Sequence, residues 1–224
     1  MANVIKLRKG LDVNLKGKAA KEEFQVKKPA VYALMPDDFT GMKPKVVVKE
    51  NDVVKVGDSL FVDKNHPEIK FVSPVSGRVT MVERGDRRKV LSVRVEADAE
   101  QQYVDFGKKN VGQMTAQEVK DLLLESGLFG FFRQRPYDVT ANPSDTPKAI
   151  FVSAFNSMPL AADFEYVLRG READFQAGLD ALAKMAKTYL GVSSKQTATA
   201  LTAAKNVEIN FFDGPAPAGN VGCL

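Results

Sequence analysis

Short valine-rich runs separated by turn residues occupy residues 43–96, and this pattern constrains the possible fold more than any other feature. Runs such as Val46-Val47-Val48 and Val53-Val54 alternate with glycine, proline and Asn-Asp turn signals. Strands at such close spacing are typical of small β-barrels and sandwiches. We interpret Arg84-Gly85-Asp86 as part of a hairpin turn rather than as an adhesion motif, because Gly-Asp suits tight turns. The sequence therefore predicts a β-barrel with its core at residues 43–96.

The last third of the chain has a different pattern. Residues 149–155 form a near-continuous apolar run, which is typical of a strand in a parallel sheet that is buried on both faces. Helices are predicted at residues 172–186 and 196–204, and further strands at residues 189–192 and 207–212. This order of strands and helices indicates an open, Rossmann-like α/β sheet.

Residues 103–148 join these two parts. Thr115 and Glu118 have the spacing of a capping box, which predicts the start of a helix that ends near Gly127. An aromatic and basic stretch follows at residues 128–135, and then a polar loop. We expect three parts along the chain: residues 1–102 for an N-terminal segment plus the barrel, residues 103–148 for a helical and loop connector, and residues 149–224 for an α/β domain.

The two ends of the chain carry further signals. Residues 11–15 alternate between apolar and polar, which predicts a short strand. A glycine- and proline-rich loop, residues 214–222, follows the third predicted strand of the α/β domain. Three strands that end in a loop make a poor sheet, so we expect the sequence to stop inside an incomplete α/β domain.

The chain contains one histidine and one cysteine, His66 and Cys223. A disulfide within the chain, a His/Cys metal site, an iron–sulfur cluster and a catalytic Cys-His pair or Ser-His-Asp triad all require more than this chain offers. His66 lies in a polar turn and is expected to be an ordinary loop residue. We therefore expect no catalytic residue, no metal site and no cofactor in this chain.

The charge pattern bears on possible partners. The net charge of +4 arises in residues 1–50, where the lysines are scattered rather than gathered on a basic and aromatic face. This pattern favours a solvated or docking surface and argues against a nucleic-acid partner. No apolar run approaches the ~20 residues that cross a bilayer.

Two motifs in the barrel resemble biotinyl/lipoyl-carrier domains, namely residues 57–60 and residues 73–79. In that family a hairpin presents a modified lysine, and Asp63-Lys64 resembles such a site. Lys64, however, comes early in its turn, with a long stretch before Pro74. We therefore expect a barrel of this shape (a barrel-sandwich hybrid) that serves a structural or docking purpose, with no lipoyl group on Lys64.

Longer motifs along the whole chain are similar to the A subunit of the sodium-translocating NADH:quinone oxidoreductase (Na⁺-NQR). They are residues 5–12, 60–64, 71–77, 159–163, 170–179 and 214–219. The family usually has histidine where this chain has Ala216, so no role of that histidine transfers here. Members are about twice as long as this chain, which agrees with the expected incomplete domain.

This resemblance implies a subunit of a respiratory enzyme that passes electrons from NADH to a quinone such as ubiquinone and exports Na⁺. The family resemblance implies a peripheral protein on the cytoplasmic side of the bacterial inner membrane, bound to the other subunits, including the membrane subunits. FMN, FAD, riboflavin and Fe–S centres are expected on those partner subunits. The fragment itself is expected to have a structural or docking function, with a further role near the quinone.

The α/β part also resembles the flavin-binding subunit of complex I and the C subunit of the Rnf electron-transport complex. In those proteins the loop after the first strand helps to hold the flavin, and here that loop includes Asn156, Ser157, Met158 and Pro159. No Gly-x-Gly-x-x-Gly follows a strand, so the residues give no independent support for dinucleotide binding.

A quinone pocket would be apolar with a few polar groups. The candidate lining residues are Phe129, Phe131, Phe132, Asn156, Ser157, Met158 and Pro159. The same aromatic side chains could instead belong to the core, and the sequence leaves both interpretations open. Two other functions also remain open, a free-standing lipoyl-type carrier module and a flavin-binding electron-transfer domain.

Overall fold

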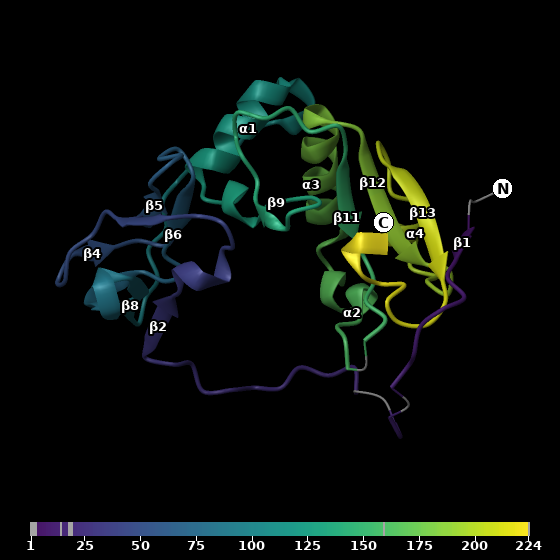
Figure 1. Cartoon of the computed structure of the whole chain (residues 1–224), viewed down its shortest axis with the longest axis horizontal. Helices are drawn as coiled ribbons and strands as arrows, with labels where there is room; N and C mark the ends of the chain where they lie inside the picture. The colour runs from purple at the N-terminus through teal and green to yellow at the C-terminus, as the bar shows by residue number, and fades with distance from the viewer. Residues whose placement is uncertain (1–3, 14, 18–19, 159, 224) are drawn as a thin grey trace. The chain divides into compact units, whose positions relative to one another are not determined.

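The structure is a computed structural model that describes residues 4–13, 15–17, 20–158 and 160–223 (Figure 1). The chain divides into two compact units, which are described separately. The barrel unit comprises residues 26–109 and 120–146. The α/β unit comprises residues 1–25, 110–119 and 147–224.

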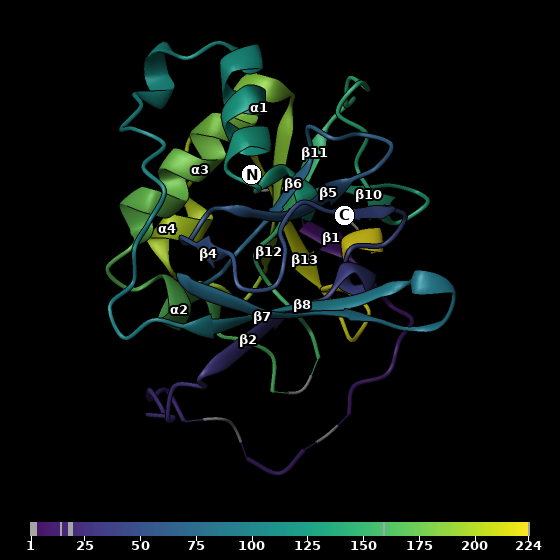
Figure 2. The same cartoon turned by 90° about the vertical axis from the view of Figure 1, so that its left-hand side faces the viewer.

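Two antiparallel sheets form the barrel unit (Figure 2). The first has the order β2 (Val31–Leu34), β8 (Val90–Ala97), β7 (Gly77–Arg84) and β4 (Val53–Val54). The second has the order β3 (Pro44–Val46), β5 (Ser59–Asp63) and β6 (Lys70–Val72). The predicted series of short, closely spaced strands at residues 43–96 is confirmed.

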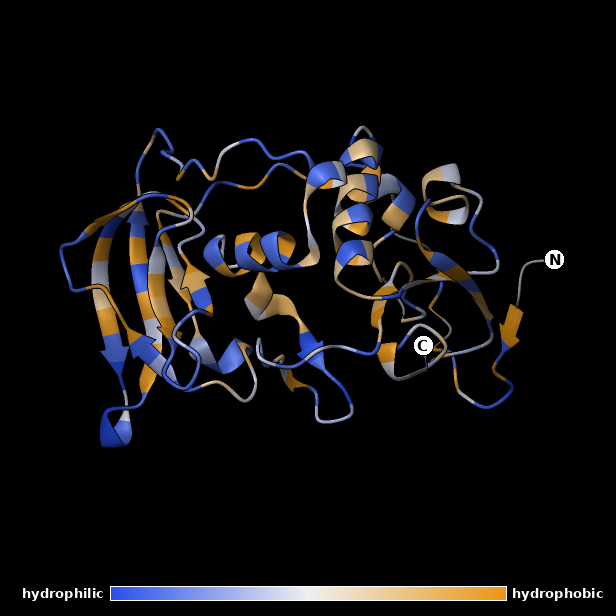
Figure 3. Cartoon of the chain, turned by 90° about the horizontal axis from the view of Figure 1, so that it is seen from above, coloured by the Kyte–Doolittle hydropathy of each residue, from blue (hydrophilic) through white to orange (hydrophobic). Residues whose placement is uncertain are grey.

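The core of the barrel unit lies between these sheets. Polar and apolar residues alternate along its strands, and Figure 3 shows the resulting stripes of hydropathy. Val79, Val93 and Val95 are almost fully buried, and the rings of Phe61 and Phe71 stack with their centroids 5.1 Å apart. Burial of each such side chain stabilises the fold by about 1.5–3 kcal/mol.

The hairpin of β7 and β8 ends in η2 (Asp86–Arg88), where the backbone does not continue as a helix. Arg87 and Arg88 both have positive φ, 53° and 62°, and the N–H of Lys89 donates to the carbonyl of Asp86 at 3.1 Å. The hairpin that Arg84-Gly85-Asp86 predicted is therefore present, but Arg87-Arg88 rather than Gly-Asp occupies the centre of its turn.

The rest of the barrel unit follows α1 (Ala116–Glu125), whose first residues belong to the α/β unit. The predicted capping box at the start of α1 is confirmed: the N–H of Glu118 donates to the hydroxyl of Thr115 at 3.3 Å, and the Glu118 carboxylate accepts the N–H of Thr115 at 2.7 Å. The chain continues through η4 (Phe129–Phe131) to the short hairpin of β9 (Arg133–Gln134) and β10 (Val139–Thr140). A further short turn of 3-10 helix in the barrel unit is η1 (Pro36–Asp38), and η3 (Val111–Gln113) and η5 (Val221–Cys223) are short turns of the same kind in the α/β unit.

A four-stranded parallel sheet forms the α/β unit. Its order is β1 (Val4–Lys6), β13 (Glu208–Asp213), β12 (Thr188–Ser193) and β11 (Ile150–Ser153). The helices of the unit are α2 (Phe164–Leu168), α3 (Glu172–Met185) and α4 (Thr199–Thr202). Leu179 of α3 and Leu201 of α4 pack with Leu190 and Val192 of β12 in one buried cluster.

The sequence indicated extended chain at residues 4–16, but it did not predict where strand β1 pairs. Val4, Ile5 and Lys6 pair in parallel with Phe211, Phe212 and Asp213 of β13. The predicted strand at residues 11–15 is wrong, because residues 11–13 and 15 form no strand. The N-terminal residues therefore belong to the α/β unit by contact, whereas the sequence grouped them with the barrel that follows them.

Two further predictions in the α/β unit need correction. β11 is an edge strand, and the Phe151 side chain is 46% exposed, so this strand is not buried on both faces. The helix predicted at residues 196–204 is limited to α4, because Gln196 accepts the N–H groups of Thr197 and Ala198 before the helix begins. The long helix α3 is confirmed within a residue of its predicted end.

Candidate functional site

Three chain segments meet at the carboxyl edge of the parallel sheet, the edge at which open α/β sheets bind their ligands. The segment after β1 contacts the loop after β13: the N–H of Leu11 donates to the carbonyl of Ala216 at 3.1 Å, and the N–H of Ala216 donates to the carboxylate of Asp12 at 2.9 Å. The loop after β13 in turn contacts the loop after β11. These contacts fix the glycine- and proline-rich loop between two segments that are far apart in sequence.

Glycine makes these approaches possible. A Cβ atom on Gly10 would lie 2.0 Å from the carbonyl oxygen of Ala216. A Cβ atom on Gly219 would lie 2.5 Å from the backbone nitrogen of Ser157 and 2.8 Å from Cα of Asn156. These glycines therefore serve backbone-to-backbone packing in this unit.

The polar residues predicted for the site are engaged within this edge. The Asn156 side chain accepts the N–H of Met158 at 2.9 Å, and the Ser157 hydroxyl accepts the N–H of Gly219 at 3.1 Å. The Met158 side chain is 53% exposed, and Pro159 lies outside the described residues. Asn156 and Ser157 thus hold the loop after β11 in shape, and Met158 is the exposed apolar group beside them in sequence.

The three predicted phenylalanines belong to the barrel unit and have different environments. Phe129 is 5% exposed and its ring centroid lies 5.5 Å from that of Phe132, which is half-buried. The Phe131 side chain is 68% exposed. Phe129 is therefore a core residue, and Phe131 is the one of the three that presents its ring to solvent.

Phe39, which the sequence reasoning missed, links Phe131 to the barrel core. Its ring centroid lies 5.6 Å from that of Phe131 and 4.4 Å from that of the buried Phe71. Phe39 follows η1 directly and lies between the polar residues Asp38 and Thr40. The candidate residues 129–132 and 156–158 fall in different units, and each set is described only within its own unit.

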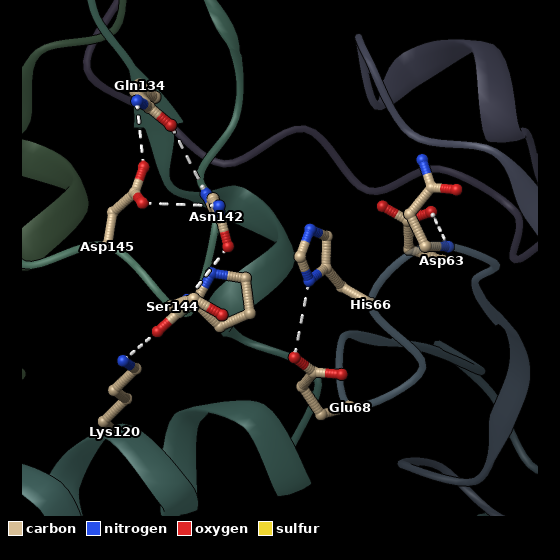
Figure 4. A network of polar contacts seen from close by, with 10 residues as sticks. Asp63, His66, Glu68, Lys120, Gln134, Asn142, Ser144 and Asp145 are labelled. Atoms are coloured by element: carbon tan, nitrogen blue, oxygen red, sulfur yellow. Dashed lines mark hydrogen bonds and ion pairs between the residues drawn. The ribbon is translucent and has the colours of Figure 1, made fainter.

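Lys64 lies at the start of the connection between β5 and β6, where its side chain is exposed. The buried Asp63 carboxylate accepts the N–H groups of Lys43 at 3.2 Å and of Asn65 at 3.0 Å. These two bonds connect the start of the turn to the residue before β3. His66, two residues after Lys64, has its Nδ1 atom 3.6 Å from the Glu68 carboxylate (Figure 4). The Asp-Lys pair of the lipoyl-like motif is thus divided between a structural carboxylate and an exposed lysine.

A separate polar network follows the β9–β10 hairpin. The Asp145 carboxylate accepts Gln134 Nε2 at 3.3 Å and Asn142 Nδ2 at 3.4 Å, and the Lys120 ammonium donates to the carbonyl of Pro143 (Figure 4). These bonds join the loop of residues 142–145 to the hairpin and to α1. Within the described residues, no group of three or more His, Cys, Asp or Glu is placed to hold a metal ion.

Two ion pairs in the α/β unit shift the pKa values of their members. Lys21 Nζ lies 2.8 Å from the Asp163 carboxylate, and its hydrogen bond holds the pKa of that carboxyl below its ordinary value, with help from the N–H of Tyr166. Lys187 contacts both Tyr189 and Glu208, and hydrogen bonding to these two partners raises the pKa of its ammonium. Both pairs are on the surface and favour the charged forms near neutral pH.

The chain matches two family models in succession. Residues 5–98 match the NqrA N-terminal barrel-sandwich hybrid domain, and residues 114–224 match the NqrA second alpha/beta domain. These descriptions agree with the two β-sheets of the barrel unit and with the parallel sheet of the α/β unit. In the described part of the chain, no helix has the length and apolar character needed to cross a membrane.

Curated relatives agree with these models. The chain is 36% identical to the Na(+)-translocating NADH-quinone reductase A subunit of Yersinia pseudotuberculosis (serotype O:1b, strain IP 31758) over 225 residues, which cover 98% of this chain and 50% of the relative. It is 36% identical to the corresponding protein of Vibrio vulnificus (strain YJ016) over 98% of the chain and 50% of the relative, and 34% identical to that of Pseudomonas aeruginosa (strain UCBPP-PA14) over 96% and 49%. The fold and these matches define a two-domain chain, a barrel-sandwich hybrid with an α/β domain. The chain belongs to the NqrA family, the A subunit of the Na(+)-translocating NADH-quinone reductase, and it spans about half the length of the relatives it matches.

Proposed function

We propose that the chain acts as a docking part of a peripheral, non-catalytic subunit in a sodium-pumping NADH:quinone oxidoreductase. The observation that carries this proposal is the match of both domains, in order, to the two NqrA domain models. The candidate edge of the α/β unit supports a structural role, because Asn156 and Ser157 direct their side-chain oxygens to hydrogen bonds within the loops of this edge. In this proposal the flavins and the Fe–S centre reside on partner subunits, on the cytoplasmic side of the inner membrane.

The test of this proposal is assembly in native membranes. Bacteria that produce a tagged protein containing this chain should yield the membrane subunits and NADH:quinone reductase activity in the same purified fraction. Removal of the gene should abolish Na⁺-dependent quinone reduction, and the intact gene should restore it. Recovery of the tagged protein alone from the soluble fraction, with full activity in the deleted strain, would reject the proposal.

We further propose a role near the quinone for exposed apolar residues of the chain. Of the predicted site residues that the structure describes, Phe131 and Met158 have large apolar side chains that are mostly exposed, and apolar side chains of this kind line small-molecule sites. A photoreactive quinone analogue added to the assembled enzyme should label peptides that contain one of these residues, and unlabelled quinone should compete. Labelling confined to other subunits would refute this role.

We also propose that Lys64 carries no lipoyl group. The N–H of Lys64 donates to the carbonyl of Lys43 at 2.7 Å, directly after the last pair of β3 and β5, so Lys64 lies at the start of its turn although its side chain is exposed. Mass spectrometry of the native protein should find Lys64 unmodified. A lipoyl adduct at this residue would instead support the carrier-module interpretation.

A further inference from the structure

The turn at the end of the β7–β8 hairpin has a backbone conformation that its residues do not favour. Positive φ at both central positions is the mark of a type I′ turn, and Arg87 has φ 53° and ψ 27°. Such turns are normally occupied by Asn-Gly or Asp-Gly, because other residues clash with their own backbone there. Two consecutive arginines at these positions therefore weaken the fold. Such a conflict between residue type and backbone conformation is typical of functional sites.

In the described part of the chain, no hydrogen bond or ion pair of the Arg87 and Arg88 side chains offsets this cost. Lys89 of the same turn is engaged with Asp37 at 2.6 Å, and Arg84 donates to the carbonyl of Arg88 at 3.4 Å. Among the residues that the structure describes, no hydrogen bond or ion pair engages the guanidinium of Arg87 or of Arg88, and both residues are exposed. The turn thus presents two exposed guanidinium groups, side by side in sequence, whose donors are available to a partner.

The hairpin also extends this turn away from the rest of its sheet. β4 pairs only with Gly77 and Arg78 at the other end of β7, and β2 pairs with residues 93–96 of β8. The last pairs of the hairpin, Glu83 with Ser92 and Arg84 with Val90, have no strand beside them. Figures 2 and 3 show the projecting hairpin and its hydrophilic tip.

We propose that this arginine turn, residues 84–89, docks on an acidic surface of a partner protein, with Arg87 and Arg88 pairing to carboxylates. Guanidinium groups pair with carboxylates through two parallel hydrogen bonds, and such pairs need a defined geometry on both sides. The turn supplies part of that geometry, because its backbone places both arginines at the tip of the hairpin.

A membrane surface fits the turn less well. Its exposed residues include no apolar side chain that could enter a bilayer. Fluid lipids also need no fixed arrangement of arginines, so a flexible basic segment would serve equally well. For the identity of the partner, the inference rests on the proposed function, which supplies the other subunits of the oxidoreductase.

The test uses a double variant that preserves the turn. R87N/R88G places the preferred type I′ residues in the turn, so the hairpin should keep its shape and the protein should unfold at a higher temperature. The matched control is K27N/K28G, which removes two adjacent exposed cations of the same unit and introduces the same two residues. Binding is measured by biolayer interferometry to solubilised oxidoreductase purified from a strain in which the gene for this chain is deleted.

The expected result is binding of the unaltered chain that weakens with salt, a roughly tenfold to hundredfold loss of affinity for R87N/R88G, and little change for the control. Equal affinities of the unaltered chain and R87N/R88G would overturn the inference while leaving the proposed function intact. No binding of the unaltered chain would overturn both. Phosphatidylcholine vesicles containing phosphatidylglycerol form the second arm, and binding to them that R87N/R88G abolishes, with binding to the oxidoreductase unchanged, would replace the protein partner by a membrane.

Discussion

Substitution of Gly219 by alanine should destabilise the α/β unit, and its magnitude follows from the packing at the carboxyl edge. The added Cβ would lie 2.5 Å from the nitrogen of Ser157, whereas ordinary contacts begin at 3.4 Å, so the two backbones must separate by about 0.9 Å. The obstructing atoms are backbone atoms, which cannot rotate away as a side chain can. Overpacking of this kind typically costs about 1–3 kcal/mol, and the shift would also break the bond from Gly219 to the Ser157 hydroxyl.

Gly178 provides the matched control. It lies inside α3, is exposed, and a Cβ atom there would have no neighbour within 4 Å. Alanine is favoured over glycine in a helix interior by about 0.5–1 kcal/mol. The same chemical change should therefore stabilise the unit at Gly178 and destabilise it at Gly219.

The assay must report on the α/β unit, because two units need not unfold together. Urea titrations followed by hydrogen exchange and mass spectrometry give the opening free energy of peptides from β12 and α3. We expect this free energy to fall for G219A and to rise for G178A. A change in G219A smaller than about 0.5 kcal/mol, the usual range for surface substitutions, would refute the argument that this glycine is required by close backbone packing.

Three further predictions concern the capping box, the barrel core and a surface ion pair. T115A should lower the free energy of unfolding by about 1 kcal/mol, since it removes the acceptor for the N–H of Glu118; urea denaturation followed by circular dichroism would show this, and no change would contradict the role of the cap. F71A should lower it by about 3–5 kcal/mol in the barrel unit, because the cavity would border Phe39 and Phe61; thermal unfolding measures this loss, and a small loss would show that the barrel collapses around the gap. The pKa of Asp163 is lowered by Lys21, so the stabilisation from this pair is present above the ordinary carboxyl pKa near 4 and disappears as the pH falls through the lower folded value. Asp163 is the N-cap of α2, where its carboxylate accepts the N–H of Tyr166 at 3.3 Å, and the amide oxygen of D163N can still accept this bond. The difference in Tm between the unaltered chain and D163N should therefore shrink between pH 6 and pH 2, and a difference independent of pH would contradict this.

Local patterns predicted the elements that form from neighbouring residues. The capping box of Thr115 and Glu118, the long amphipathic α3 and the valine-rich barrel strands each carry a signal within a few residues. β11 was recognised as a strand for the same reason. Its partial exposure was not foreseen, since an apolar run does not reveal whether a strand is central or at an edge.

Long-range features left no such signal. β1 has only three residues, and its partner β13 lies about two hundred residues later in the chain. The role of Phe39 likewise depends on rings from β6 and η4 that come together only in the fold. The conformation of Arg87 and Arg88 was hidden for the opposite reason, because the residue types argue against the turn that the chain adopts.

The position of β1 gives the α/β unit an unusual dependence on the start of the chain. The sheet needs β1 beside β13, so most of the chain, including the barrel unit, lies in sequence between two strands that pair. The entropic cost of such a closure grows only with the logarithm of loop length, and a folded barrel within the loop reduces the effective length further. The segment after β1 then offsets part of this cost, because Leu11 and Asp12 bind both backbone groups of Ala216. The same residues that close the sheet thus also shape the loop at its carboxyl edge, so loss of the first strand should disturb the candidate site as well as the stability of the unit.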